Sequence, residues 1–387
     1  MMDWEAYRDE YAYKIIEHCA NTLYEKKAEW EQDYASYISR IVKNSSMINE
    51  VRQEFHEFAP LFLYTPVDNV IHAGDSVNSR LKYQLRYRGT KVATLQYSVR
   101  KKHFILKPVD STLQQFDFPD KTDGSNLSWT GDEARNIRDY FKAYTDSKDI
   151  RRKEARYESA LITELAKEAK DAKNPEDNKL ITGIQPIRLL NGRFQMPTVY
   201  SASDIKNMFN SKKQNACEVL PYRGGNGGGI DIMCRVGTWD SHPAIVELKY
   251  QNTNSEPLHV ALSQALAYAV FIRTLLRSNA ASGAAWWKHL FGYTRTLPQK
   301  LTIDVVAAMP LKKGECPDSY SEPFFTKRVI KMSKVFGDDE YGDDEFQMHY
   351  MFFDIDKSNN DRVTYIKTSL GVTENKPSAR GSAEAGN

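Results

Sequence analysis

The stretch 224–268 constrains the fold of this chain more than any other, because it places two apolar segments between a glycine-rich run and a helix. The glycine-rich run 224–229 leads into the mostly apolar segment Ile230–Val236, and a short polar connection leads into a second one, Ala244–Tyr250. Apolar segments of this length, bounded by turn residues, are typical of strands in a buried sheet. We therefore expect a sheet at the centre of the molecule with at least one helix packed on it.

Three charged residues interrupt these apolar segments. Asp231 lies in the first segment, and Glu247 and Lys249 lie in the second. Because strand side chains alternate, Glu247 and Lys249 should emerge on one face, with Leu248 buried behind them. Phosphodiester hydrolysis can use a Mg²⁺ ion held by carboxylates, with an ammonium nearby to orient or deprotonate the attacking water. Asp231 and Glu247 are the expected metal ligands, the Leu248 carbonyl is a further one, and Lys249 is the expected catalytic cation.

Two helical segments carry further polar residues at defined positions. In the helix that begins near residue 151, Glu158 falls in the middle of the apolar stripe, whereas Glu164 points away from it. A buried carboxylate is costly unless it is paired, protonated or close to a metal, so Glu158 is a candidate ligand; an ordinary capping or edge glutamate is the alternative. Gln264 and Tyr268 share one face of the later helix, either to support the site or for helix packing.

The glycine-rich run has two possible roles. It lacks the Gly-Lys-Ser/Thr ending of a nucleotide-binding loop, so that function is excluded for it. Gly227 and Gly228 would let backbone amides approach a DNA phosphate next to Asp231. A flexible connection between strands is the alternative.

Upstream of residue 148 the pattern is first helical and then strand-like. Helices are expected over 4–42 and, with Ser46 as the N-cap, over 46–58. Period-two alternation then predicts three antiparallel strands, at 81–88, 92–99 and 104–107. The N-terminal part should therefore combine helices with a β-meander.

This meander is rich in cations. Lys82, Arg86 and Arg88 share one parity of the first strand, and Lys91 follows directly. One face of the sheet is therefore expected to be polar and largely basic. Such a face either follows the phosphates of DNA or is the ordinary solvated side of an antiparallel sheet.

Downstream of the central stretch, the pattern predicts more sheet. The segment 301–309 reads as a strand, and 348–355 with 362–368 reads as a hairpin. The acidic segment 337–345 between them is expected to be a solvated loop. Residues 375–387 have the composition of a disordered tail.

Composition limits the classes of function. The 387 residues carry a net charge of only +2, so any nucleic-acid surface must be a local patch rather than a basic body. Four widely separated cysteines argue against a zinc site or a disulfide framework. A charged N-terminus does not resemble a signal peptide, and a membrane span is not expected. We expect a cytoplasmic protein.

The segment Glu158–Met309 resembles the PD-(D/E)xK nuclease superfamily, whose core is a helix, a three-strand meander, a second helix and a further strand. The segment 228–232 followed by 247–249 looks like the motif of Mrr-type restriction endonucleases. Gln264 and Tyr268 look instead like the Gln-x-x-x-Tyr helix of RecB-type nucleases. This mixture leaves the subgroup open.

The resemblance implies Mg²⁺-dependent DNA cleavage, with Mn²⁺ as a substitute. It also implies that Asp231, Glu247 and Lys249 form the catalytic triad, with Glu158 as the first-helix carboxylate. The chain departs from the superfamily pattern because no Pro precedes Asp231. Many members of the superfamily also lack this proline. A helical and sheet part joined to such a nuclease also resembles the layout of bacterial anti-phage effectors, including the Shedu type.

The expected fold is therefore α+β. A helical and β-meander domain (1–148), for DNA binding, sensing or oligomerisation, precedes a mixed-sheet nuclease domain with flanking helices (149–374). The expected function is DNA cleavage in prokaryotic restriction or anti-phage defence. The protein is expected to form a homo-oligomer and to make no membrane contact. A phage-derived or system-encoded protein is a further expected partner. The alternatives are a non-catalytic nucleic-acid-binding or regulatory protein that keeps the nuclease fold, an RNase, and a transposon-encoded endonuclease.

Overall fold

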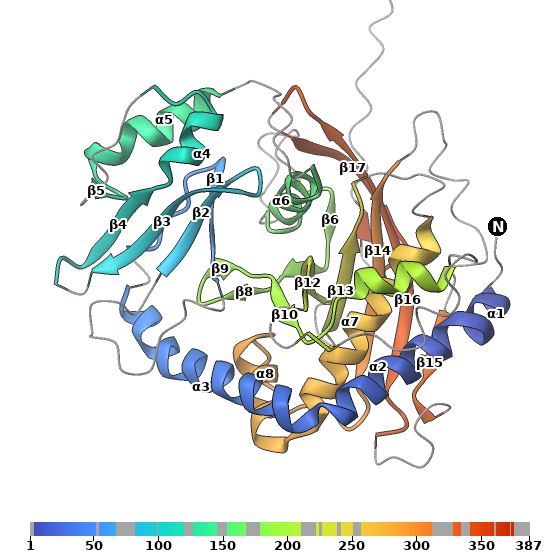
Figure 1. Cartoon of the computed structure of the whole chain (residues 1–387). Helices are drawn as coiled ribbons and strands as arrows, with labels where there is room; N and C mark the ends of the chain where they lie inside the picture. The colour runs from blue at the N-terminus through green and yellow to red at the C-terminus, as the bar shows by residue number, and fades with distance from the viewer. Residues whose placement is uncertain are drawn as a thin grey trace, which may run out of the picture.

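The structure is a computed structural model, and it has an α+β fold of helices and mixed sheets (Figure 1). It describes residues 4–51, 54–66, 82–98, 100–119, 127–144, 153–167, 179–209, 222–223, 227–237, 241–250, 257–311, 328–333, 341–359, 361–371 and 373–374. Some sequence predictions fall partly or wholly outside these residues: the glycine-rich run up to Asn226, residues 52–53 of the helix predicted over 46–58, the start of the helix predicted near 151, the strand ends Leu81 and Val99, the acidic residues 337–340 and the tail 375–387.

The chain begins with a nearly continuous helical segment. Its elements are α1 (Trp4–Tyr7), the π-helical η1 (Arg8–Ala12), α2 (Tyr13–Glu25) and α3 (Lys27–Val51). The prediction of a new helix from Ser46 was wrong, because the helical backbone breaks at Lys26 and then continues to Val51. The neighbouring Ser45 hydroxyl donates back to the Val42 carbonyl, as a serine inside a continuing helix does.

The N-terminal sheet has seven strands, in the order β5-β4-β3-β2-β1-β9-β8. The three predicted meander strands are confirmed, with the turn at Arg88 and Gly89, and Tyr83, Leu85 and Tyr87 point into the core. The strands are β1 (Leu61–Tyr64), β2 (Lys82–Tyr87), β3 (Thr90–Ser98), β4 (His103–Pro108), β5 (Leu127–Ser128), β8 (Arg188–Leu189) and β9 (Gly192–Arg193). The accompanying helices are α4 (Asp110–Gln115), the 3₁₀ turn η5 (Asp132–Ala134) and α5 (Arg135–Ala143).

The second large sheet is mixed, in the order β15-β16-β14-β13-β12-β7, with β17 on β16. β13, β14 and β16 are parallel, whereas β7, β12, β15 and β17 are antiparallel to their neighbours. The strands are β7 (Ile184–Pro186), β12 (Ile232–Val236), β13 (His242–Leu248), β14 (Thr302–Pro310), β15 (Arg328–Lys331), β16 (Glu345–Asp356) and β17 (Arg362–Thr368). The strand predicted at 301–309 and the hairpin predicted after it are confirmed.

Helices cover both faces of this mixed sheet. Val246 and Val306 pack with α6 (Lys153–Leu165), whereas Ile245 and Val305 pack with α7 (Leu258–Ser278). After α7, Asn279 caps α8 (Ala280–His289) through its side-chain oxygen. The remaining elements are β6 (Ile181–Thr182), β10 (Met196–Thr198), the 3₁₀ helix η7 (Ala202–Phe209), β11 (Gly228–Ile230) and β18 (Thr373–Glu374).

Helix α7 is the most apolar helix of the described chain. By length and composition it could cross a membrane, but 83% of its most apolar window is buried inside the fold. It packs against β13, β14, α2 and α8. It is therefore the core helix of the mixed sheet.

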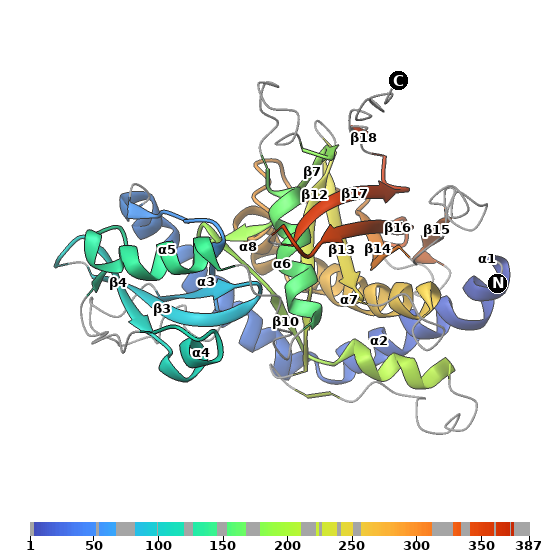
Figure 2. The ribbon, with the colours of Figure 1, turned by 90° about the horizontal axis from the view of Figure 1, so that it is seen from above.

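The N-terminal and C-terminal parts of the chain are interlocked. β1 pairs in parallel with β9 at Tyr64 and Arg193, so a C-terminal hairpin completes the N-terminal sheet. Tyr34 of α3 lies 5.1 Å, between ring centroids, from Phe271 of α7. Figures 1 and 2 show α2 of the N-terminal part lying beside α7 of the C-terminal part. The division at residue 148 stays a prediction, and the two parts share one sheet and one core cluster.

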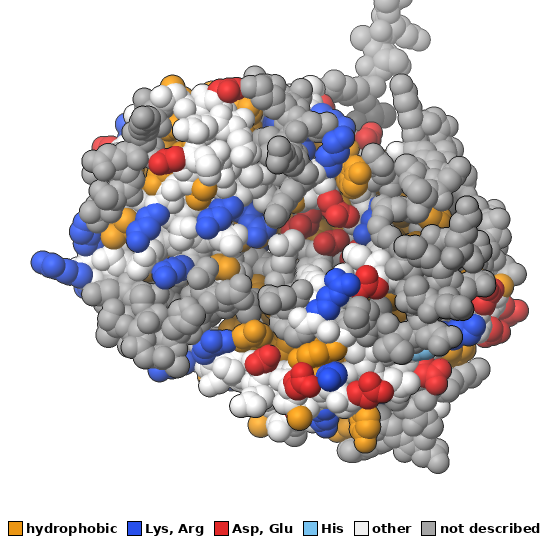
Figure 3. All heavy atoms as spheres, viewed as in Figure 1, with side chains coloured by type: hydrophobic (Ala, Val, Ile, Leu, Met, Phe, Trp, Pro, Cys, Tyr) orange, Lys and Arg blue, Asp and Glu red, His pale blue; other side chains and the backbone are white. Residues whose placement is uncertain are grey.

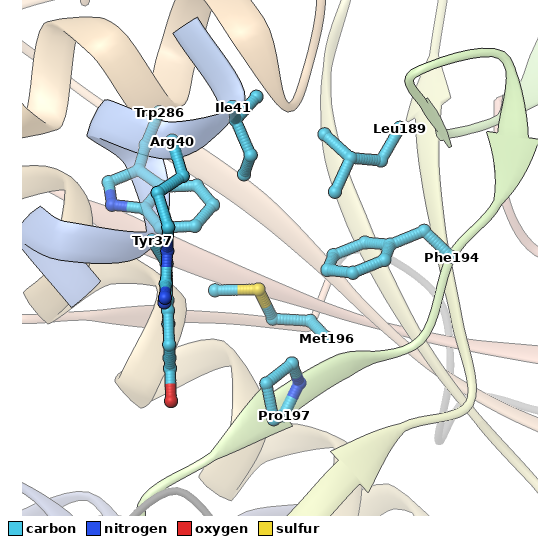
Figure 4. Close-up of a pocket in the computed structure, with 8 residues that line it drawn as sticks. All are labelled: Tyr37, Arg40, Ile41, Leu189, Phe194, Met196, Pro197 and Trp286. Atoms are coloured by element: carbon cyan, nitrogen blue, oxygen red, sulfur yellow. The ribbon is translucent and has the colours of Figure 1, made fainter. Parts of the chain in front are cut away.

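Where α3 meets α8 and the segment β8–β10, a small gap remains. Tyr37, Met196 and Trp286 are among its lining side chains, and Figure 4 shows them converging from these three regions. The gap holds about 10 Å³, which is about the space of one water molecule. It is too small for an organic ligand and belongs to the packing of the two parts.

The expectation of a solvated loop at 337–345 is wrong for Asp344. This side chain is buried and accepts hydrogen bonds from Arg273 Nε at 3.0 Å, Arg277 Nη2 at 2.7 Å and the Leu301 backbone N–H at 2.8 Å. The two arginines lie four residues apart on α7 and face the same carboxylate. Asp344 therefore connects α7 to the beginning of β14.

Candidate active site

The three charged residues of the central stretch meet at the carboxyl end of β13. Asp231 lies at a bend between β11 and β12, where the chain changes its pairing partner from β10 to β13. Its Oδ2 atom accepts the Leu248 N–H at 2.8 Å, and Lys249 Nζ lies 2.6 Å from Glu247 Oε1. The predicted alternation on this strand is confirmed, because Leu248 points into the core that packs on α6.

Glu158 joins this group from α6. The residue is 3% exposed, and its Oε2 atom accepts a hydrogen bond from Gln195 Nε2 at 2.7 Å. Its Oε1 atom has no hydrogen-bond partner among the residues that the structure describes. Glu154, one turn earlier, lies 3.6 Å from the Lys249 ammonium. α6 thus brings two carboxylates towards the end of β13.

The burial of Glu164 shows that the helical phase of α6 predicted the direction of its side chains but not which of them are buried. The Glu164 side chain points away from Glu158, as predicted, but it is also buried. It pairs with Lys167 and accepts the Leu180 N–H at 2.8 Å. A surrounded helix has no fully solvated face, so helical phase alone could not separate a site carboxylate from a structural one.

Gln264 and Tyr268 approach from α7, on the other face of the sheet. The Tyr268 hydroxyl accepts the Ala202 N–H at 3.4 Å. A Cβ atom at Gly228 would lie 2.7 Å from that hydroxyl, and one at Gly227 would lie 2.5 Å from the Thr198 carbonyl oxygen. Close packing against neighbouring groups therefore accounts for these two glycines without a phosphate.

Gln264, one turn before Tyr268 on α7, is a buried polar side chain without hydrogen-bond partners among the described residues. It is fully buried, and neither its amide oxygen nor its amide nitrogen has a hydrogen-bond partner within the described part of the chain. An unpaired buried amide costs about 1–3 kcal/mol. A structural role in packing would not require this polar group.

The carboxylates of the site repel one another. Burial raises the pKa of Glu158 to about 8, and the Glu154 charge contributes in the same direction against the lowering effect of two arginines. Burial raises the pKa of Asp231 well above its usual range, and the charges of Glu247, Glu158 and Glu154 raise it further. Burial disfavours the Lys249 ammonium, but Glu247 and Glu154 outweigh that effect and raise its pKa. The site therefore favours an additional positive charge.

The N-terminal sheet reaches this site through Arg86 and Gln195, for which the sequence indicated no such contact. Arg86 Nη1 donates to Gln195 Oε1 at 3.3 Å, and Gln195 in turn donates to Glu158. Arg86 also lies over the Tyr64 ring at 4.3 Å. Gln195 carries no sequence signal of this role, because its two partners lie far away in the sequence. Arg86 was expected on a DNA-binding face, and the structure places it beside the carboxylates.

The predicted DNA-binding set must be corrected at Arg88. Its side chain is only 9% exposed, and its Nε atom lies 3.1 Å from Asp361 Oδ2. This position follows from the tight β2–β3 turn, where Gly89 approaches the backbone of Ala155 in α6 so closely that a Cβ atom would lie 2.3 Å from the Ala155 carbonyl oxygen. Lys82 is half-buried and Lys91 is exposed, so these two remain candidates for contact with DNA.

The donor set fits a hard divalent cation by its chemistry. Buried carboxylates are the ligands that Mg²⁺ prefers, and their mutual repulsion would be relieved by such an ion. Among the residues with described positions, however, no three acidic, histidine or cysteine side chains are already grouped for ligation. Glu247 contacts Lys249 instead, and Asp231 contacts the Leu248 N–H. Figure 3 shows acidic side chains gathered beside α6, with cationic side chains on either side.

No family model, curated protein or solved structure matches this chain significantly. Any function assigned to the site must therefore be argued from its own residues.

The raised pKa of Glu158 predicts how stability depends on pH without metal. The folded state keeps a proton on Glu158 between its usual pKa of 4.5 and about 8, whereas the unfolded state releases it. The contribution of Glu158 to stability should therefore be fully present below pH 4.5 and be lost as the pH rises towards 8, by up to about 5 kcal/mol. Glu158→Gln should make this slope shallower, leaving the part that Asp231 contributes, and should be more stable than wild type at pH 9, as measured by urea unfolding in EDTA.

Glu164→Gln is the matched control on the same helix. It removes a carboxylate that is already paired with Lys167, so it should lower stability at neutral pH and leave the contribution of Glu158 to the slope in place. Identical pH profiles for wild type and Glu158→Gln would show that Glu158 does not hold a proton in the fold.

Proposed function

We propose that this protein is a Mg²⁺-dependent deoxyribonuclease that hydrolyses phosphodiester bonds. The observation that carries the proposal is the convergence of Asp231, Glu247 and Lys249 at the end of one strand, with Glu158 beside them. In support, α6, β7, β12, β13, α7 and β14 occur in the order that the resemblance implies, although β8 to β11 and η7 come between β7 and β12. Biological context in restriction or anti-phage defence rests on the sequence resemblance alone.

Asp231, Glu247 and Glu158 would hold the ion, with the Leu248 carbonyl as a further donor. Bound Mg²⁺ would supply positive charge to neutralise the phosphate and to lower the pKa of a water molecule. Lys249 would orient the attacking water and take part in its proton transfer, because its ammonium already lies among the carboxylates. Glu247 would then exchange its contact with Lys249 for the ion, which frees the ammonium.

The surrounding residues would position these groups. Gln195 fixes one oxygen of Glu158, and Arg86 fixes Gln195, so the N-terminal sheet sets the orientation of a metal-binding carboxylate. Tyr268 limits the space beside Gly228. Activity should therefore depend on the N-terminal part as well as on the mixed sheet.

DNA is the proposed substrate because cations flank an acidic centre. Lys91 is the strand partner of Arg86, which reaches the site through Gln195, and the exposed Lys91 and half-buried Lys82 would contact phosphates of the bound DNA. With a net charge of only +2, this local arrangement must supply the attraction. A homo-oligomer and a cytoplasmic location remain part of the proposal.

The test is a cleavage assay with purified protein on plasmid DNA, single-stranded DNA and RNA. Each substrate is incubated with Mg²⁺, with Mn²⁺ and with excess EDTA. We expect cleavage of DNA with either metal and none in EDTA. Cleavage that persists in EDTA would refute the metal mechanism, cleavage of RNA alone would make the protein an RNase, and DNA binding without cleavage would favour a non-catalytic role.

Gln264 provides a second test, because stability and activity should change in opposite directions. Gln264→Leu replaces an unpaired buried amide by an apolar group of similar size, so the free energy of unfolding should rise by about 1 kcal/mol. DNA cleavage should fall about 10- to 100-fold if the amide orders the phosphate or Lys249. Urea unfolding and initial cleavage rates measure the two effects.

The neighbouring Ser263 is the control. Its hydroxyl lies 2.8 Å from the Tyr7 hydroxyl and also donates to the His259 carbonyl. Ser263→Ala should therefore lower stability by about 1 kcal/mol and leave cleavage unchanged. Full activity in Gln264→Leu would assign Gln264 to packing.

A further inference from the structure

A cavity of about 400 Å³ lies on a different side of α6 from Glu158. One wall is formed by β1, the β2–β3 turn and α5 of the N-terminal part, and the other by α6 and β17. Its volume is in the range of small-molecule binding sites and is far above that of the gap in Figure 4. None of the proposed catalytic residues lines it.

Cationic side chains outnumber carboxylates in the described lining of the cavity. Among the described lining residues are two carboxylates, Glu164 and Asp361. The cationic side chains of the lining are Arg88, Lys142, Arg156, Lys167 and Arg362. Glu164 pairs with Lys167, and Arg88 and Arg156 both pair with Asp361. Because cations outnumber carboxylates in the described lining, an anion in the cavity would be attracted to it.

Two of these arginines already form a clamp around an oxyanion. Arg156 Nε donates to Asp361 Oδ2 at 2.6 Å, and Arg88 Nε lies 3.1 Å from the same atom. Both side chains are about nine-tenths buried, which strengthens their attraction to an anion. Guanidinium pairs of this kind match the oxygens of a phosphate as well as those of a carboxylate.

The described lining also has an apolar part, besides the uncharged polar residues Ser159, Thr163 and Asn359. Pro60, Phe62 and Val363 contribute to the same cavity, and Arg193 lies 3.6 Å from the centroid of the Phe62 ring. A single inorganic phosphate would leave most of the volume empty. A flat organic group attached to a phosphate would fill it and would contact the aromatic ring.

We propose that this cavity binds a small organic phosphate, such as a mononucleotide. The phosphate lies against Arg88, Arg156 and Lys142, and the organic part lies against Phe62. The proposal is independent of the nuclease function, because it uses a different side of α6 and none of the metal ligands.

The experiment measures binding of AMP, inorganic phosphate and adenosine to the full chain by calorimetry in EDTA. Without added metal, the carboxylates of the candidate active site repel phosphate, so binding there does not interfere. We expect saturable binding of AMP, weaker binding of phosphate, and no binding of adenosine. Lys142→Glu should weaken AMP binding about tenfold, because an exposed cation of the cavity wall becomes an anion.

Lys107→Glu is the matched control, since it makes the same charge change at an exposed position of β4 away from the cavity. Its affinity for AMP should equal that of wild type. A second variant, Phe62→Ala, should weaken AMP and leave inorganic phosphate unchanged. Absence of AMP binding, equal affinity in the two lysine variants, or equal binding of adenosine and AMP would overturn the proposal. The wild-type cleavage assay is unaffected by any of these results.

Discussion

Replacing Asp231 by asparagine or Glu247 by glutamine should lower the rate of DNA cleavage by about 1000-fold or more. Each change removes one negative charge from the proposed metal ligands while keeping an oxygen that can accept a hydrogen bond. Asparagine at 231 can still accept the Leu248 N–H, and glutamine at 247 can still contact Lys249. The fold should therefore persist while the metal is lost. Single-turnover cleavage rates in Mg²⁺, with a thermal melt of each variant, measure both effects.

The control for charge alone is Asp354→Asn. Asp354 is exposed on β16 and bonds only locally, to the Ile355 N–H, among the contacts that the structure gives it. This variant should cleave at the wild-type rate. If Asp231→Asn also cleaved within about threefold of wild type, the carboxylates would have to be assigned to folding rather than chemistry.

Replacing Asp344 by alanine should lower the free energy of unfolding by about 3–5 kcal/mol. The change leaves Arg273 and Arg277 buried beside each other without their shared carboxylate, and it removes the acceptor of the Leu301 N–H. Uncompensated buried cations are far more costly than the loss of an exposed ion pair. Urea unfolding at neutral pH measures the difference from wild type.

Asp343→Ala is the matched control, one residue earlier in the same acidic segment. Asp343 is exposed, so its loss should change the free energy of unfolding by less than about 0.5 kcal/mol. Equal effects at the two positions would show that Asp344 is solvated like the rest of the acidic segment, as its composition suggests.

The parts of the site that depend on neighbouring residues in the chain could be predicted. Alternation along β13 places Glu247 and Lys249 on one face, and the structure confirms their contact. The helical phase of α6 correctly buries Glu158 in the same way. Strand alternation and helical period are local properties, so the sequence contains them directly.

The parts that depend on distant contacts could not be predicted. Arg88 has the parity of a surface cation, but a tight turn places it against Asp361, which is distant in sequence. Asp344 lies in an acidic run, yet α7 supplies two arginines that bury it. Gln195 looks like an ordinary polar residue in the sequence, but in the fold it accepts a hydrogen bond from Arg86 and donates one to Glu158. Each role is created by a partner that no local pattern identifies.

The parallel pairing of β1 with β9 affects how such a chain can evolve by recombination. A break near residue 148 would leave the β8–β9 hairpin with an open edge and would uncover the face of α7 that packs on α2. Open edges and exposed apolar helices promote association with other chains. A new N-terminal module could therefore replace the present one only if it brought both a strand for β9 and a helix for α7.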